Sequence, residues 1–282
     1  MAANPLERCI RSAVRANASQ ASLFGKVGSV EHPNGAVLVA YRNANRALKS
    51  ALREENKISA VREVLLQLKR TVRTESGEIL TSADVFGLSE AERQLEYYNK
   101  PNGYKVPQDI NPAVQSIVSE VDRQQILIEG MLINDLDPML ITGDEEHQGT
   151  LRFGPVAIAA AFWISTTVWS AYSKHVARNA PSFDKQAVAA LDLRTTDCCL
   201  RVHGQIQRFE GKFELTGSPR FADELEWSPF HYNCRTSIVL YDQIFDNGLT
   251  DRMEESADYV MQKRKSGERF DQHPADAFVT IP

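Results

Sequence analysis

The sequence predicts an α+β protein: a mainly helical N-terminal unit, then a helix and a small antiparallel sheet. Apolar residues recur at helical spacing through much of the first half, whereas from about residue 187 they fall in short runs between turn residues. A length of 282 residues, with 43% hydrophobic and 24% charged content, suits two globular units. We expect an N-terminal arm over 1–35, an all-helical domain over 36–140, an α+β module over 150–245, and a C-terminal helix with an extended tail over 246–282.

The helical domain is predicted from three signals. Apolar side chains recur every three or four positions over residues 36–52 and again over 61–72, so each stretch should form a helix. Residues 89–92 read Ser-Glu-Ala-Glu, the spacing of a capping box, and predict the start of a separate short helix. Asn111 followed by Pro112 predicts the start of another helix.

Charge is distributed unevenly along the chain. A net charge of −5 with a pI near 5.8 argues against a dedicated nucleic-acid-binding protein. Residues 42–73 are an exception, with nine Lys or Arg against three Glu. This basic segment is either a solvated face or a surface that contacts DNA or an acidic partner.

The polar loop at residues 144–149 is a plausible domain boundary. A segment without charged residues follows it. Phe153 to Ser173 has no charged residue, and its length matches the roughly 20 residues that span a bilayer. Gly154 and Pro155 at its start and the polar residues 165–167 at its centre argue against a span. We expect a helix buried in a soluble protein or assembly, and membrane insertion is disfavoured.

Short apolar runs then predict the sheet, with a hairpin at Gly211 and a long loop over 216–229. The predicted strands cover residues 187–191, 202–209, 212–215 and 236–241. Thr250 and Asp251 can cap a final helix, which Gly267 should end.

Cysteine and histidine gather in the same part of the chain. Three of the four cysteines and two of the six histidines lie between residues 191 and 241. Two short pairs far apart in sequence are typical of small zinc sites, because each pair occupies one turn. The sequence therefore suggests a metal site made by Cys199, His203, His231 and Cys234.

Several alternatives fit the same residues. Cys199 and Cys234 could form a disulfide, although no secretion signal is evident. The cysteines could be buried apolar groups, with hydrogen-bonded histidines beside them. A thiol enzyme would use Asn233 to orient a histidine, and a small nuclease or toxin-like effector would use the two histidines with Arg235. No Gly-rich phosphate loop or paired-carboxylate motif is present, so we do not expect an enzyme.

Two arginines flank this cluster and have a structural interpretation. Arg194 and Arg235 can pair with Asp192 or Asp197 and so fix the loops that carry the cysteines and histidines.

At these residues the sequence resembles the phage Mu F-like minor head protein family, which carries the phage head-morphogenesis domain. Asp192–Thr195 matches the Asp-x-Arg-Thr opening of the family motif, and Cys199 falls on its second cysteine. His203–Gly204 matches the next element, and Pro229–Arg235 matches the last one before a strand. The match covers roughly residues 155–241, less than a third of the chain.

The chain departs from the family pattern at three positions. Thr196 stands where the family often has its first cysteine, Tyr232 replaces a proline, and Thr236 replaces the final cysteine. A four-cysteine metal site is therefore excluded, and only the mixed cysteine–histidine set remains. A zinc ion at that set is the one cofactor that the sequence suggests.

The resemblance implies a minor capsid protein of a tailed phage, located in the virion head. Such a protein would associate with portal or major capsid subunits and act in head assembly or in DNA packaging and delivery. The basic helices of residues 42–73 would then face packaged double-stranded DNA, and the apolar helix of residues 153–173 would pack against a neighbouring subunit.

Overall fold

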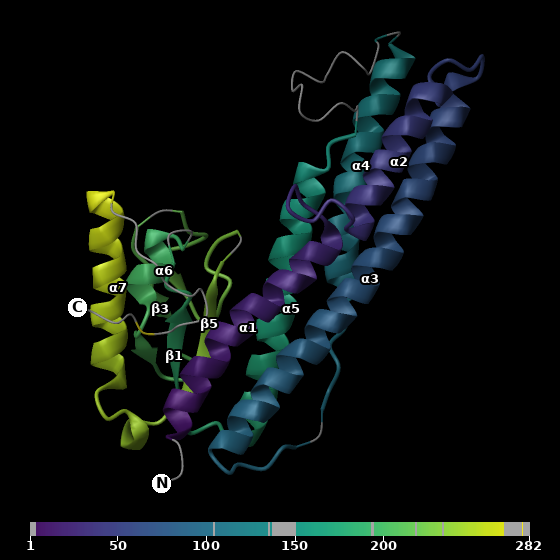
Figure 1. The fold of residues 1–282 in the computed structure, drawn as a ribbon. Coiled ribbons are helices and arrows are strands. Elements are labelled where there is room, and N and C mark those ends of the chain that lie inside the picture. Colours follow the sequence, from purple (N-terminus) through teal and green to yellow (C-terminus); the bar gives the residue numbers. More distant parts are fainter. Residues whose placement is uncertain are drawn as a thin grey trace. The chain divides into compact units, whose positions relative to one another are not determined.

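The computed structural model describes most of the chain and divides it into two compact units (Figure 1). The described residues are 4–103, 105–134, 136, 151–192, 195–217, 219–232, 234–267 and 278. The first unit, here called the sheet unit, comprises Met1–Ala21, Ala83–Gln108 and Ser165–Pro282. The second, called the helical unit, comprises Ser22–Ser82 and Asp109–Ile164. The predicted α+β class is confirmed, because helices dominate and the described strands are few and antiparallel.

This division cuts across the domain boundaries that the sequence suggested. Three helices run from one unit into the other: α1 (Pro5–Val27), α3 (Lys57–Tyr97) and α5 (Gly154–Asn179). At about 1.5 Å per residue, α3 is roughly 60 Å long, so its two ends can bury side chains in different cores. The predicted N-terminal arm is instead helix α1, which buries Leu6 and Ile10 completely.

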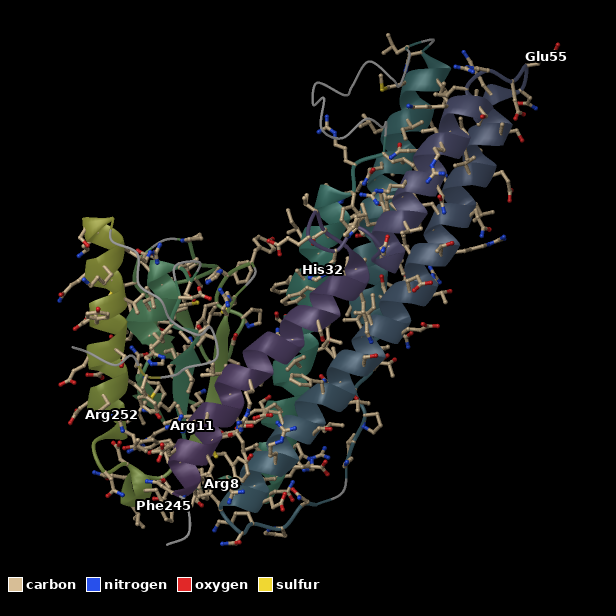
Figure 2. The ribbon with its side chains drawn as sticks, in the orientation of Figure 1. Arg8, Arg11, His32, Glu55, Phe245 and Arg252 are labelled. Atoms are coloured by element: carbon tan, nitrogen blue, oxygen red, sulfur yellow. The ribbon has the colours of Figure 1, made fainter. Side chains whose placement is uncertain are left out.

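The start of α1 is fixed inside the sheet unit. Asn4 accepts the Leu6 backbone N–H at 2.9 Å and donates its side-chain amide to the Phe245 carbonyl at 2.7 Å. One turn later the Arg8 guanidinium lies 4.0 Å from the centre of the Tyr97 ring, at the end of α3 (Figure 2). This segment, for which the sequence predicted no helix, is therefore tied to the other two stretches of the sheet unit.

The helical unit contains α2 (Ala36–Ala51), α4 (Asn111–Ile133) and the unit's parts of α3 and α5. The predicted helices over 36–52 and 61–72 and the predicted start at Asn111 agree with these elements, with Ile110 as the N-cap of α4. Antiparallel α3 and α4 are joined by two ion pairs, Arg62–Glu129 at 2.9 Å and Lys69–Asp122 at 2.5 Å. The core residues of α2, α3 and α4 include Val37, Tyr41, Leu48, Val61, Leu65, Leu68, Val72, Ile117, Val118 and Val121.

The predicted helix start at residues 89–92 is wrong, because α3 continues through them. Ser89 is not a cap: its hydroxyl donates to the Val85 carbonyl one turn earlier, at 2.9 Å. A capping residue needs extended backbone, and tertiary packing here favours the helix instead. Gly87 sits so close to α5 that a Cβ would lie 2.1 Å from the Val168 carbonyl oxygen, which makes glycine necessary at this crossing.

The sheet unit is built around three antiparallel strands in the order β2 (Ile206–Gln207), β1 (Asp184–Ala189) and β5 (Thr236–Tyr241). Strand β1 lies in the centre, and β5 is buried along its whole length. Helices α6 (Asp197–Val202) and α7 (Leu249–Ser266) lie on one side of the sheet, and α1 lies on the other (Figure 1). Leu191, Leu200, Ala257 and Val260 form the core beneath α6 and α7.

The strand predictions were right at β5 and in part elsewhere. The expected strand over 202–209 is reduced to β2, because the residues before it finish α6. The hairpin at Gly211 is wrong: β3 (Phe213–Glu214) pairs with β4 (Glu224–Leu225), inside the predicted loop. The final helix is confirmed as α7, with Gly267 as a left-handed C-cap at φ 70°. The polar loop at 144–149 and all of the predicted tail except Phe278 lie outside the described residues.

The charge-free segment forms α5 as predicted. This helix is long and apolar enough to cross a membrane by length and composition, and 44% of its most apolar window is buried. In the sheet unit Trp169 and Tyr172 are buried, whereas in the helical unit Ile158 is 49% exposed. That the exposed apolar side chains of α5 pack against a neighbouring subunit remains a prediction.

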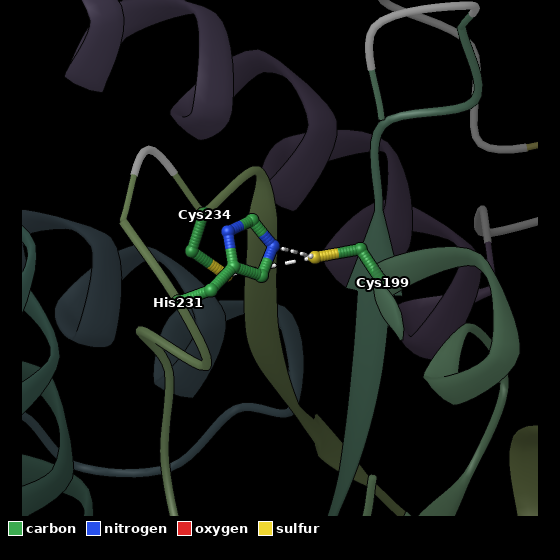
Figure 3. Close-up of side chains that lie close together, drawn as sticks. All are labelled: Cys199, His231 and Cys234. Atoms are coloured by element: carbon green, nitrogen blue, oxygen red, sulfur yellow. Dashed lines mark hydrogen bonds between the residues drawn. The ribbon is translucent and has the colours of Figure 1, made fainter. Parts of the chain in front are cut away.

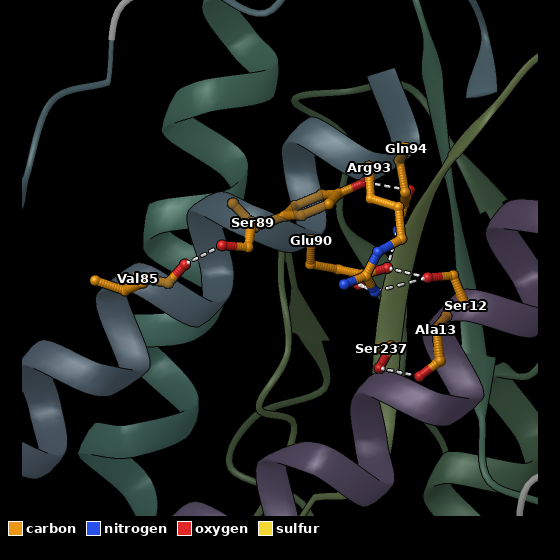
Figure 4. Close-up of polar contacts among 9 residues, drawn as sticks. Ser12, Ala13, Val85, Ser89, Glu90, Arg93, Gln94 and Ser237 are labelled. Atoms are coloured by element: carbon orange, nitrogen blue, oxygen red, sulfur yellow. Dashed lines mark hydrogen bonds and ion pairs between the residues drawn. The ribbon is translucent and has the colours of Figure 1, made fainter. Parts of the chain in front are cut away.

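Two side chains of α3 and one backbone carbonyl of α1 bind strand β5, and Figure 4 shows the contact between Ser237 and Ala13. The Gln94 side-chain oxygen accepts the Leu240 N–H at 3.0 Å, and the Tyr98 hydroxyl donates to the Leu240 carbonyl at 3.1 Å. Ser237 donates its hydroxyl to the Ala13 carbonyl at 3.1 Å. These bonds satisfy edge groups that would otherwise lack partners in a buried strand, and so hold β5 in register.

Candidate metal centre

Three of the four predicted ligands meet in one buried cluster. The ligand atoms of Cys199, His231 and Cys234 lie within 4.8 Å of one another (Figure 3). Cys199 stands on α6, whereas His231 and Cys234 come from the segment that leads into β5. All three side chains are at least 95% buried. This cluster therefore joins two segments that are more than thirty residues apart in the sequence.

Local structure explains how α6 presents its cysteine. Thr196 is the N-cap, with extended backbone at φ −66° and ψ 155°, and its hydroxyl accepts the Cys199 N–H at 3.4 Å. Cys199 is thereby placed in the first turn of the helix. The neighbouring loop is held by Thr195, whose N–H and hydroxyl both donate to the Asp192 carboxylate.

An ion pair connects this loop to the second ligand segment. Arg235 lies 2.5 Å from the Asp192 carboxylate, and the Arg235 carbonyl accepts the Ala190 N–H at 2.9 Å. The predicted structural pairing of Arg235 is confirmed. Arg194 and Asn233, which the sequence analysis also named, lie outside the described residues.

The His231 ring is oriented with one nitrogen toward the cluster. Its Nδ1 lies 2.7 Å from the Tyr232 carbonyl oxygen, which can only accept, so Nδ1 is the protonated nitrogen. The other ring nitrogen, Nε2, faces Cys199 Sγ at 2.9 Å and Thr196 Oγ1 at 2.8 Å. A carbonyl that fixes the tautomer in this way is the usual support for a metal-binding histidine.

The cysteines differ in acidity. Burial raises the pKa of Cys199, but hydrogen bonds with Cys234, Thr236 and Thr196 outweigh it, and the net pKa falls below the ordinary value. Burial and the adjacent Cys199 raise the pKa of Cys234 well above that value. Burial also raises the pKa of Cys198, to about 11. Of the three, Cys199 gives up its proton most readily.

His203, the fourth predicted ligand, does not join the cluster found among the described residues. Its Nδ1 accepts the Ala189 N–H of β1 at 2.9 Å, and its side chain is 2% exposed. The spacing from Cys199 suits neighbouring positions on a helix, but α6 ends at Val202 and His203 has extended backbone at φ −63° and ψ 123°. The ring is therefore turned toward the sheet, and the predicted ligand set must be corrected.

The donor atoms suit a metal ion. Two sulfurs bound to a zinc ion at about 2.3 Å in tetrahedral geometry are about 3.8 Å apart. The sulfurs of Cys199 and Cys234 are 3.7 Å apart, and both are free thiols in this structure. Two sulfurs and an imidazole nitrogen are soft to borderline ligands, so the group could hold a metal ion.

The residues of the predicted nuclease set are each engaged separately. His203 bonds to the backbone of β1, His231 belongs to the buried cluster, and Arg235 pairs with Asp192. Both histidines are at least 96% buried. This arrangement does not present two imidazoles and a guanidinium together to a substrate.

Lys185, which no sequence pattern singled out, anchors the segment that carries His231 and Cys234. Its side chain is fully buried in β1, and its ammonium donates to the Glu226 carbonyl at 2.7 Å. The same group lies 4.4 Å from the centre of the Trp227 ring and 5.3 Å from that of Phe213. Burial lowers the pKa of Lys185 to about 8. The lysine ties β1 to the chain just before His231.

Comparisons with protein-family models, with curated proteins and with solved structures found no match to this chain.

Proposed function

We propose that the chain is a minor structural protein of a tailed-phage head, in which one zinc ion joins α6 to the segment before β5. One observation carries this proposal: two separate pieces of the sequence that resembles the head-morphogenesis motif, at Cys199 and at Pro229–Arg235, meet in the buried cluster of Cys199, His231 and Cys234. A bound zinc ion would supply a cross-link between them.

The burial of the cluster favours a structural role. Cys199 is 0%, His231 4% and Cys234 5% exposed, so a substrate could not reach them without local opening. An activated cysteine nucleophile needs an accessible sulfur, whereas structural metal sites are closed. The burial of these side chains thus supports a structural metal cross-link better than it supports an enzyme active site.

Zinc fits the donors better than the hard cations do. Calcium and magnesium prefer oxygen ligands, whereas cysteine sulfur and imidazole nitrogen are the common ligands of structural zinc. Two thiolates would also balance the charge of one divalent ion, which matters in a buried site.

The proposed role in the head includes a contact with double-stranded DNA. Arg42, Arg46 and Lys49 lie on α2 at spacings of four and three residues, so they share one exposed face. Helix α2 contains no Asp or Glu. On α3, by contrast, Arg62 and Lys69 are paired with carboxylates of α4. The α2 face is therefore where we place the phosphate contacts.

Salt dependence of DNA binding tests this contact. Each cation that binds a phosphate contributes about 0.9 to the slope of log affinity against log salt. Replacing Arg46 and Lys49 together with Gln should lower that slope by about 1.8, measured by fluorescence anisotropy on a mixed-sequence duplex. The matched control replaces Arg62 and Lys69 with Gln. A slope that falls equally in both variants would refute a specific role of the α2 face.

Association with the head tests the central part of the proposal. The protein should be found in purified, nuclease-treated heads, and should copurify with the portal or major capsid protein of the same genome when they are co-expressed. Its absence from purified heads would contradict the proposal. Phosphodiesterase activity that His203→Ala removes without unfolding the protein would favour the nuclease instead.

A further inference from the structure

We propose that Thr196 supplies the fourth ligand, an oxygen, of the metal ion held by Cys199, His231 and Cys234. This inference depends on the metal site proposed above. The Thr196 hydroxyl lies 2.8 Å from His231 Nε2, the ring nitrogen that faces the cluster. Thr196 is the N-cap of α6, and this position holds its hydroxyl beside the turn that carries Cys199.

A fourth ligand is required because structural zinc sites are closed and tetrahedral. His203 does not provide it in this arrangement, because its ring lies outside the cluster and its Nδ1 accepts the Ala189 N–H of β1. Ser228 also lies near the cluster, but its hydroxyl donates to Cys234 Sγ at 3.4 Å. The buried Thr236 hydroxyl also lies beside the Cys199 thiol. Thr196 is assigned because its hydroxyl contacts both His231 Nε2 and the Cys199 N–H.

The hydroxyl of Thr196 can serve both roles. A threonine oxygen has two lone pairs and one proton. One lone pair accepts the Cys199 N–H at 3.4 Å, which leaves the second for a cation. With two thiolates, a neutral imidazole and a neutral hydroxyl, a divalent ion has its charge balanced inside the buried site.

Metal affinity of four forms of the full chain tests the assignment. Thr196→Val keeps the shape of the side chain but removes the oxygen, and should weaken zinc binding about 10- to 100-fold in a chelator competition. Thr196→Ser keeps the hydroxyl and should bind within about threefold of the wild type. Thr196→Cys should bind more tightly, and its cobalt form should gain thiolate charge-transfer absorption because a third sulfur joins the metal.

The loss of the helix cap must be separated from the loss of a ligand. Capping stabilises α6 whether or not metal is bound, so its loss should lower the melting temperature equally with zinc and with a chelator. Loss of a ligand should instead reduce the difference between the zinc-loaded and chelated melting temperatures. Thr196→Val should shrink that difference, and Thr196→Ser should restore it.

Each outcome decides the assignment. Unchanged zinc affinity in Thr196→Val, or an equal fall in melting temperature with zinc and with chelator, would overturn the role of Thr196 and leave the three-residue site standing. A wild-type chain that binds neither zinc nor cobalt would overturn the site and the inference together.

Discussion

Lys185 carries a positive charge into the sheet unit, where a carbonyl and two aromatic rings surround its ammonium group. The folded pKa of about 8 lies below the ordinary 10.5, so the unfolded chain binds more protons between these values. The penalty for burying the charge is full below pH 8 and fades as the pH rises toward 10.5. Nearby Glu226 opposes this shift but does not reverse it.

We therefore expect the folded state to gain stability between pH 7 and pH 9, and Lys185→Met to reduce that gain. Methionine keeps most of the side-chain volume but cannot titrate. Urea denaturation of both proteins at the two pH values measures the effect. Equal pH dependence in both proteins would show that the buried ammonium is not its source.

His203 stabilises the sheet unit, and we expect it to contribute nothing to metal binding. His203→Ala removes the acceptor of the Ala189 N–H and should cost about 1–3 kcal/mol of unfolding free energy. The zinc content of the purified variant should equal that of the wild type. A variant that folds but loses its zinc would return His203 to the ligand set.

Residue types alone identified Cys199, His231 and Cys234, because soft ligands in short pairs are rare in a cysteine-poor chain. They could not show that the His203 ring bonds to strand β1, since that depends on where α6 ends. Thr196 was visible only as a departure from the family motif. Its contact with His231 joins residues 35 positions apart, which no local pattern encodes.

Helix α3 shows how two glycines in one element can have opposite requirements. A Cβ at Gly87 would lie 2.1 Å from the Val168 carbonyl oxygen, whereas a Cβ at Gly77 would meet nothing within 4 Å. Gly87→Ala should therefore destabilise the protein despite its better helix propensity. Gly77→Ala should stabilise it by about 0.5–1 kcal/mol, and paired denaturation curves measure both changes. Stabilisation by both variants would mean that the close crossing of α3 and α5 is wrong.

Strand β5 depends on α3 for part of its hydrogen bonding. Gln94 also accepts the hydroxyl of Tyr172 at 2.7 Å, so one amide oxygen serves two buried donors. Gln94→Ala should cost about 2–6 kcal/mol in unfolding free energy, because it strands two buried donors and each costs about 1–3 kcal/mol. Exposed Gln67 on the same helix is the matched control, with an expected change within about 0.5 kcal/mol. Equal effects at both sites would show that the edge of β5 is satisfied in another way.

Helix periodicity predicted where most helices lie. It did not predict where they end or in which unit their apolar side chains are buried. The capping box at residues 89–92 is a genuine local signal that the packing around Gly87 and Glu90 overrides. The short strands β2, β3 and β4 have two residues each, too few to show an alternating pattern. Helix α1 was missed although it buries residues along its length.

At the scale of the whole molecule, the chain returns repeatedly to the same cores. The sheet unit takes three separate stretches of sequence and the helical unit takes two. The sequence suggested contiguous domains. In such domains the apolar side chains of each stretch would be buried only against residues nearby in the sequence, whereas each unit here combines separate stretches. Within the last stretch of the sheet unit, a cross-link between Cys199 and Cys234 would join residues 35 positions apart, and it would lower the entropy of the unfolded chain more than a local one does.

The metal content of the purified chain tests the central claim most directly. We expect about one zinc ion per wild-type chain and about one in Cys198→Ala, but none in Cys234→Ala, which should also melt earlier. The two variants make the same chemical change at two buried cysteines, only one of which belongs to the cluster. A wild-type chain with no metal and four free thiols would contradict the account.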